Sequence, residues 1–166
     1  MLIDQAIKQY GKRLYGLCLT LCADQDNADD LYQDTWLKVI QHMKQYDRSK
    51  EFEPWLTQIC VNTYRNRLRR IAKSPIFNGF SSTEKKDTIM DTIVAAPKKD
   101  YSSLHEAIGK LPEKLKVTMI LFYFRDMDLQ STALVLNIPV GTVKSRLNKA
   151  KKLLKEALKN ESDLSF

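Results

Sequence analysis

Apolar residues recur at steps of three and four along two long stretches of the chain. In residues 54–72 the stripe consists of Leu56, Cys60, Tyr64, Leu68 and Ile71. In residues 140–160 it consists of Val143, Leu147, Ala150, Leu154, Ala157 and Leu158. At 100° per residue each set falls on one arc, so each pattern predicts an amphipathic helix with one buried face.

Helical spacing and turn residues predict the other elements as well. Upstream we expect about four helices over roughly 3–22, 26–43 and 54–72, with a short break at YDRSKEFEP. Asp24 or Asp26 can cap the second helix, and Pro54 stands where the last would begin. Downstream we expect four helices, at 103–110, 112–125, 128–136 and 140–160. The predicted fold class is therefore all-α, and the last two helices outline a helix-turn-helix.

Residues 74–102 interrupt this pattern. The stretch contains Pro75, Gly79 and Pro97, a Ser-Ser-Thr cluster and no sustained amphipathic period. Such a length is unusual for a loop inside one compact domain, although a long surface loop is the alternative. We expect two small helical domains, 1–73 and 103–166, joined by a flexible linker at 74–102.

Charge is spread unevenly along the chain. The chain of 166 residues has a formal net charge of +7, which makes an anionic partner plausible. Residues 61–73 contain five basic residues and no acidic one: Arg65, Arg67, Arg69, Arg70 and Lys73. A solvated helix face usually mixes charges of both signs, so this run favours a nucleic-acid contact.

The residues that catalysis or metal binding would need are few. Three cysteines, Cys18, Cys22 and Cys60, accompany only two histidines, and no CxxC or HxxxH spacing occurs. Cys18 and Cys22 lie on an apolar helix, where buried packing is the expected role. We predict no metal site, no cofactor and no enzymatic activity. No run of 18 apolar residues exists, so we expect a protein that is not membrane-inserted, in the reducing cytoplasm.

The last predicted helix carries a candidate face for duplex DNA. Ser145 and Asn148 lie opposite its apolar stripe, with Lys144 and Lys149 on the flanks. Thr142 and the first-turn N–H groups suit phosphate contacts. A solvated basic face is the alternative, but the preceding helix and tight turn favour placement in a major groove.

The helix predicted at 54–72 carries a second candidate face. Trp55, Asn62, Asn66 and Arg69 fall opposite the apolar arc, and Arg65 flanks them. Amides and guanidinium groups can bind base edges and phosphates, and an aromatic ring can stack on an unpaired base. Packing of Trp55 against the YDRSKEF loop remains an equal alternative.

An acidic face is predicted on the second helix. Asp30, Gln33 and Asp34 lie at positions i, i+3 and i+4 and so share one side. These residues suit either docking of a basic partner or a solvated surface. We expect them to be exposed, so that charge reversal at both acids would leave thermal melting nearly intact.

These three segments, in this order, resemble the extracytoplasmic-function sigma factors of bacterial RNA polymerase over about residues 3–158. DNADDLYQDTWLKV resembles the family's D-A-D-D-L-x-Q-E-T-F-L segment. PWLTQICVNTYRNRLRR resembles its W-L-x-x-I-A-x-N-x-x-x-D-x-x-R-R helix. The block ending LNIPVGTVKSRLNKAKKLL resembles L-G-I-P-x-G-T-V-K-S-R-L-x-R-A-R. Ser131, Asn137 and Asn66 depart from the family pattern, although Asn137 can adopt a left-handed turn conformation.

The resemblance implies partners and roles for these segments. It implies that Asp30, Gln33 and Asp34 dock on the β′ clamp helices of core RNA polymerase, and that the C-terminal domain rests on the β flap. It assigns −10 promoter DNA to Asn62, Arg65, Asn66, Arg69 and Trp55. It assigns −35 promoter DNA to Thr142, Lys144, Ser145, Arg146, Asn148 and Lys149. An anti-sigma factor, which in this family is often membrane-anchored, is a further implied partner. A stand-alone helix-turn-helix regulator of duplex operators is the alternative function.

Overall fold

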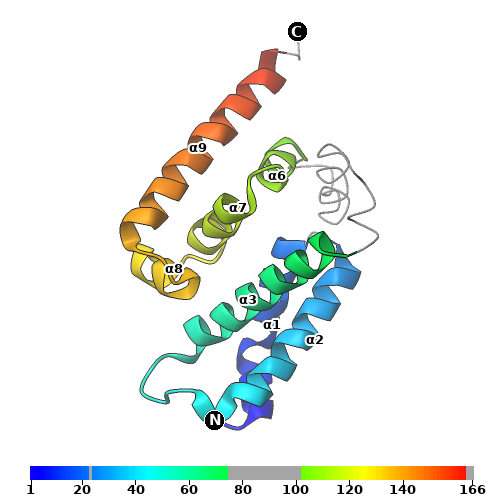
Figure 1. The fold of residues 1–166 in the computed structure, drawn as a ribbon, viewed down its shortest axis with the longest axis vertical. Coiled ribbons are helices and arrows are strands. Elements are labelled where there is room, and N and C mark those ends of the chain that lie inside the picture. Colours follow the sequence, from blue (N-terminus) through cyan, green and yellow to red (C-terminus); the bar gives the residue numbers. More distant parts are fainter. Residues whose placement is uncertain (23, 75–101, 164–166) are drawn as a thin grey trace. The chain divides into compact units, whose positions relative to one another are not determined.

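The computed structural model describes residues 1–22, 24–74 and 102–163 (Figure 1). All regular elements in these ranges are helical, as the sequence predicted. Contacts divide the chain into two compact units, one holding α1 to α3 and the other α6 to α9. The linker predicted at 74–102 lies outside the described residues, apart from Ser74 and Ser102.

The N-terminal unit contains three α-helices and one short turn of 3-10 helix. These are α1 (Ile3–Cys22), α2 (Gln25–His42), η1 (Met43–Gln45) and α3 (Phe52–Ala72). The expected number of about four is therefore reached only when the single turn η1 is counted. Helix α2 packs against both α1 and α3, and α1 also contacts α3 (Figure 1).

The start of α2 follows a local rule. Asp24 is the N-cap residue, and its Oδ1 accepts a hydrogen bond of 2.9 Å from the backbone N–H of Asn27. This bond satisfies an N–H group that has no partner within the helix. Of the two candidate caps in the sequence, Asp24 is the one used, and Asp26 lies in the first turn.

The start of α3 differs from the prediction by two residues. The helix begins at Phe52, so Pro54 stands within its first turn rather than at its first position. Proline is tolerated there because the first N–H groups of a helix have no intrahelical acceptor. The ring of Phe52 is buried, and it packs 5.1 Å from Tyr10 and 5.4 Å from Tyr46, centroid to centroid. The helix therefore starts two residues earlier than predicted, because Phe52 is held in the core by these contacts.

The core of the N-terminal unit contains the predicted apolar arc and all three cysteines. Leu56, Cys60, Tyr64 and Leu68 of α3 are buried, as predicted. Cys18 and Cys22 of α1 are also buried and not disulfide-bonded, which confirms their expected packing role. The sulfur atoms of Cys18 and Cys60 lie 3.8 Å apart at the contact of α1 with α3.

The C-terminal unit contains the four helices expected from the sequence. They are α6 (Ser102–Gly109), α7 (Glu113–Met119), α8 (Leu129–Leu136) and α9 (Val140–Asp163). The helix predicted at 112–125 changes character midway, because α7 continues as a π-helical turn, η2 (Ile120–Phe124). The backbone N–H of Arg125 donates to the carbonyl of Ile120, 3.1 Å away, and closes this wider turn.

Two local features set the helix-turn-helix formed by α8 and α9. Asp128 caps α8, where its Oδ1 accepts a 2.6 Å hydrogen bond from the N–H of Ser131, and this bond lowers the pKa of the carboxyl group. Asn137 ends α8 in the left-handed region, with φ 53° and ψ 50°. The expectation for Asn137 is thus confirmed, and asparagine adopts this conformation at lower cost than most residues.

The long helix α9 is held by its predicted apolar stripe. Val143, Leu147, Ala150 and Leu154 belong to one buried cluster of the C-terminal unit. Helices α6, α7 and α8 all contact α9, and they supply the other side chains of that cluster together with Leu111 from the turn between α6 and α7. None of the helices in the described part of the chain is long and apolar enough to span a membrane.

Two leucines of α2 test this account of the core. Leu31 is fully buried, whereas Leu37 is 57% exposed. Leu31→Ala should lower the free energy of unfolding by about 2–5 kcal/mol, because it leaves a cavity. Leu37→Ala, the matched control, should change it by less than about 0.5 kcal/mol. Urea denaturation followed by circular dichroism measures both, and equal losses would contradict the assigned rotation of α2.

Candidate functional site

The exposed face of α2 is partly acidic and partly apolar. Asp30 and Gln33 are exposed on α2, as predicted. Leu37 and Ile40 continue the same side at steps of four and three, and their side chains are 57% and 53% exposed. We call these four residues, together with the half-buried Asp34 beside them, the α2 face. The two apolar members were not predicted from the sequence, although their position outside the buried stripe of α2 is a signal for them.

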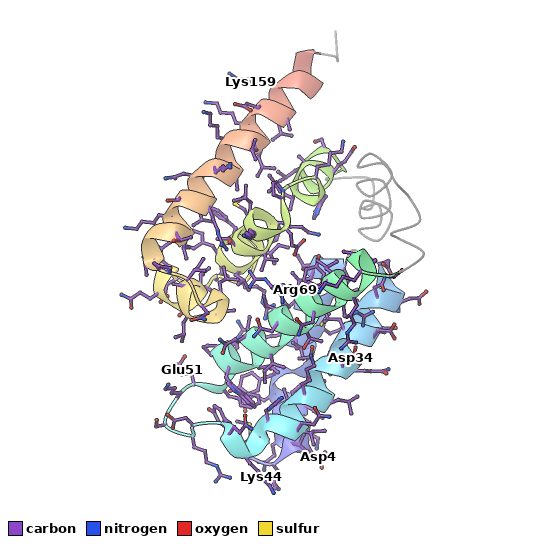
Figure 2. All side chains as sticks on the ribbon, viewed as in Figure 1. Asp4, Asp34, Lys44, Glu51, Arg69 and Lys159 are labelled. Carbon is purple, nitrogen blue, oxygen red and sulfur yellow. The ribbon has the colours of Figure 1, made fainter. Side chains whose placement is uncertain are left out.

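Arg67 of α3 lies beside the acidic end of the α2 face. Its Nη2 is 3.6 Å from Asp30 Oδ2, and its Nη1 is 3.4 Å from Asp34 Oδ2. Nη2 also lies 3.4 Å from the side-chain oxygen of Asn27. Figure 2 shows that Asp34 and Arg69 come from the neighbouring helices α2 and α3. In the sequence, Arg67 stood out only as one member of a basic run. Its pairing with Asp30 and Asp34 depends on the packing of α3 against α2.

This arrangement changes the expectation for charge reversal. The side chains of Asp30 and Asp34 are 66% and 48% exposed, and that of Arg67 is 21% exposed. Replacing both acids by lysine would place two cations beside a half-buried guanidinium group. The double reversal should therefore lower the melting temperature by a small amount, and substitutions that leave Arg67 paired give a cleaner test of docking.

The Asn/Arg face of α3 is arranged as predicted. Asn62, Asn66 and Arg69 are exposed, and Arg65 is half-buried at the edge. Arg69 Nη1 donates to Asn66 Oδ1 across 3.3 Å, so these two side chains orient one another. The arrangement presents amide groups and positive charge along one side of the helix, without an acidic residue from α3 beyond Glu53.

Trp55 packs against the loop that precedes α3. Its ring centroid lies 4.8 Å from that of Tyr46 and 5.5 Å from that of Phe52. The Tyr46 hydroxyl donates to the backbone carbonyl of Lys50, and burial raises the pKa of that hydroxyl above its ordinary value. The packing role considered for Trp55 is thus observed, and its half-buried ring leaves part of the surface open to other contacts. Tyr46 is the first residue of the YDRSKEF loop named in that alternative, but the sequence did not single it out as the partner of Trp55.

The candidate residues of α9 divide into two groups. Lys144, Ser145, Asn148 and Lys149 are exposed together near the start of the helix. Thr142 and Arg146 are half-buried at one edge of this face. One nitrogen of Arg146, Nη1, is buried and has no hydrogen-bond partner among the described residues. The structure therefore brings four of the six residues together on the open side of α9.

The open side of α9 is extended by further lysines. Lys151 and Lys152 are exposed one turn later, and Lys159 lies near the far end of the helix (Figure 2). Lys151 Nζ stands 5.4 Å from the centroid of the Tyr123 ring of η2. An array of cations on one rigid helix can follow a phosphate backbone.

Among residues 1–22, 24–74 and 102–163, no three histidine, cysteine or acidic side chains are grouped closely enough to hold a metal ion. The faces of α2, α3 and α9 present charged groups, amide groups and apolar side chains to solvent.

The link between Arg67 and the acids can be measured as a coupling energy. Arg67→Met keeps the aliphatic stem and should lower the free energy of unfolding by about 1 kcal/mol, as expected for partly exposed ion pairs. The loss should shrink when Asp34→Asn is already present. Urea denaturation of the double-mutant cycle measures this, with Arg70→Met, an exposed arginine of the same helix, as control. Strict additivity would show that the ion pair makes no contribution.

Comparison with known proteins places both units in one family. The model of Sigma-70 region 2 matches residues 6–74, and that of Sigma-70, region 4 matches residues 101–154. The α2 and α3 faces lie within the first match and the start of α9 within the second.

Relatives and solved structures agree with these matches. The chain is 26% identical over 160 residues to the ECF RNA polymerase sigma factor SigW of Bacillus subtilis, covering 91% of this chain and 86% of the relative. It is 29% identical over 168 residues to the RNA polymerase sigma factor SigV of the same organism, covering 99% and 95%. In fold it is similar to the sigma factor RpoE from Bartonella quintana, solved with the anti-sigma factor NepR, at a TM-score of 0.71 and 20% identity over 94% of this chain and 96% of that one. It is also similar to CnrH, solved with the cytosolic domain of CnrY, at a TM-score of 0.66 and 19% identity over 95% and 88%. With both sigma-70 regions in order along one short all-α chain, this protein belongs to the extracytoplasmic-function sigma factors, which are non-enzymatic transcription initiation factors.

Proposed function

We propose that the chain binds core RNA polymerase and directs it to promoters by recognising −10 and −35 elements and assisting strand opening. The observation that carries this proposal is the pair of faces on the N-terminal unit. An acidic and apolar face on α2 and an Asn/Arg face on α3 belong to one rigid three-helix packing. A regulator that binds duplex DNA alone would need neither. We propose the domain limits 1–73 and 103–166, with 74–102 as the linker.

The α2 face is the proposed docking surface for the β′ clamp helices. Asp30 and Asp34 share the single cation Arg67, so a negative charge remains for a basic partner. Leu37 and Ile40 add exposed apolar area beside the charges. Apolar contact with a charged rim is typical of protein–protein interfaces. The C-terminal unit is proposed to rest on the β flap.

The α3 face is the proposed −10 reader. Asn62, Asn66 and Arg69 are exposed, with Arg65 at the edge, and can bind base edges and phosphates of a strand that has left the duplex. Trp55 is held by Tyr46 and Phe52, which fixes its ring beside the loop that would receive an unpaired base. A ring held in place loses less conformational entropy on binding.

The start of α9 is the proposed −35 reader. Lys144, Ser145, Asn148 and Lys149 would face the major groove, where Lys144 and Lys149 also reach phosphates at its rim, and Thr142 and Arg146 would lie toward the phosphates. The backbone at Gly141 is open to solvent, because a Cβ atom built there would have no other atom within 4 Å. A phosphate group could therefore approach the backbone closely.

An anti-sigma factor is the further proposed partner. RpoE and CnrH, which share this fold, were solved with NepR and with the cytosolic domain of CnrY. We propose that the chain itself acts on DNA in the cytoplasm and is not inserted in a membrane.

A first test of the proposal addresses docking. Gln33→Arg places a cation in the centre of the α2 face and leaves the pairs of Arg67 in place. It should weaken binding to core polymerase by about tenfold or more, and Leu37→Ala should weaken it by several fold, on the order of a central interface contact. Fluorescence anisotropy of labelled chain against core polymerase measures the affinity. Gln9→Arg, the same change on the exposed side of α1, should bind like the wild type. If Gln33→Arg also binds normally, the docking surface lies elsewhere.

A second test separates the two DNA-reading faces. In run-off transcription with core polymerase, the wild-type chain should support initiation from its promoter. Lys144→Ala should weaken closed-complex formation and lower the salt slope by about 0.9, because one phosphate contact is lost. Asn62→Ala should spare −35 footprinting but reduce strand opening by about tenfold, on the order of one lost base contact. Permanganate reactivity of thymines near the start site reports the opening.

Templates with a pre-melted bubble sharpen this test. The Asn62→Ala defect should persist on them, because the proposed reading is of single-stranded bases. Wild-type behaviour of Asn62→Ala on both templates, together with loss of all binding in Lys144→Ala, would favour the stand-alone helix-turn-helix regulator.

A further inference from the structure

A shallow notch lies on the surface between α1 and α2, beside the α2 face. Its volume is about 390 Å³. It is lined by Gly11, Lys12, Tyr15, Asp29, Tyr32 and Gln33. None of these residues except Gln33 takes part in the proposed docking contacts, so the notch has no assigned role.

The shape of this notch depends on Gly11, which has no side chain. A Cβ atom on Gly11 would stand 2.8 Å from the hydroxyl oxygen of Tyr32, which is closer than such atoms approach in proteins. The Tyr32 hydroxyl can take this position because position 11 has no side chain. Its ring packs edge-on against Tyr15, with centroids 5.6 Å apart and planes at 87°.

The notch contains one carboxylate in a fixed orientation. Tyr15 Oη donates to Asp29 Oδ1 across 2.6 Å, and this hydrogen bond raises the pKa of the Tyr15 hydroxyl. Asp29 forms no ion pair within the described part of the chain, and its second oxygen remains available to a donor. Two phenol rings and one oriented carboxylate make a site with the chemistry that a guanidinium group requires.

We propose that this notch receives an arginine side chain of the same protein that docks on the α2 face. The proposal rests on the function proposed above and adds a second contact to it. Gln33 lines the notch and also belongs to the α2 face, so the two surfaces are continuous. Asp29 and Asp30 are adjacent in the sequence, which makes this edge of the unit attractive to a basic partner.

Arginine fits this site better than lysine does. A planar guanidinium group can stack on the Tyr32 ring while it donates hydrogen bonds to Asp29, whereas an ammonium group is a compact and strongly hydrated charge. The one cation in the lining, Lys12, is exposed on a flexible side chain and can turn away into solvent. The Gln33 side-chain oxygen offers a further acceptor at the rim.

The test compares two acids of the same helix. Asp29→Asn removes the charge from the notch and should weaken binding to core polymerase by about tenfold, on the order of one charge-assisted hydrogen bond. Asp26→Asn removes the same charge one turn earlier, outside the notch, and should weaken binding by no more than about threefold through long-range attraction. Fluorescence anisotropy at two salt concentrations measures both variants.

A second variant fills the notch without changing its charge. Gly11→Ala displaces the Tyr32 hydroxyl and raises the helix propensity of α1. It should weaken binding to core polymerase by about fivefold or more, on the order of a displaced interface contact, while the melting temperature stays the same or rises. Loss of affinity together with a lower melting temperature would indicate disturbed folding and would count against the proposal.

The outcomes separate this inference from the docking proposal. If Asp29→Asn matches Asp26→Asn while Gln33→Arg still weakens binding, the notch is unused and the α2 face stands. If none of these variants changes the affinity for core polymerase, the docking proposal itself fails. If Asp29→Asn weakens binding only to an anti-sigma factor and leaves core binding unchanged, the occupant was wrongly assigned.

Discussion

The rotation of each helix about its own axis is the constraint on which both candidate surfaces of the N-terminal unit depend. Helix α2 buries Ala28, Leu31 and Val39, and α3 buries Leu56, Cys60 and Leu68. Burial of these stripes contributes most of the favourable free energy of packing. Once they are buried, the opposite sides of both helices must face solvent. A rotation of either helix by one residue position would bury charged groups, at a cost that the core could not offset.

Electrostatics then adjusts the surface that packing has exposed. Arg67 stands between the N-terminal helices and pairs with two acids of α2, which would otherwise repel one another. The pairs are long and partly exposed, so their contribution to stability is small. Their larger effect is on position, because they hold the carboxylates near one end of the α2 face. With one guanidinium group for two carboxylates, a net negative charge remains to attract a partner. The free energy cost of removing water from these paired carboxylates is lower than for unpaired ones.

Local sequence rules act mainly at the ends of the helices. Asp24 and Asp128 each accept a hydrogen bond from a backbone N–H that the helix leaves unpaired. Asn137 provides the left-handed residue between α8 and α9. These features depend on neighbours within four residues, and so they could be predicted from the sequence alone. The start of α3 could not, because it depends on Phe52 packing against Tyr10, which lies 42 residues earlier.

In the described residues, the sequence by itself determined the helical class, the start of each α-helix to within about two residues and the placement of most candidate residues on exposed faces, although α7 gives way to η2 after Met119 and α9 runs on to Asp163. It did so because apolar spacing, caps and turn residues are local signals. Only the tertiary structure decided which side chains meet. The pairing of Arg67 with Asp30 and Asp34, the aromatic support of Trp55 and the notch at Gly11 all join residues of different helices. Their distances depend on how the helices pack together, and the spacing of residues along a single helix carries no information about that.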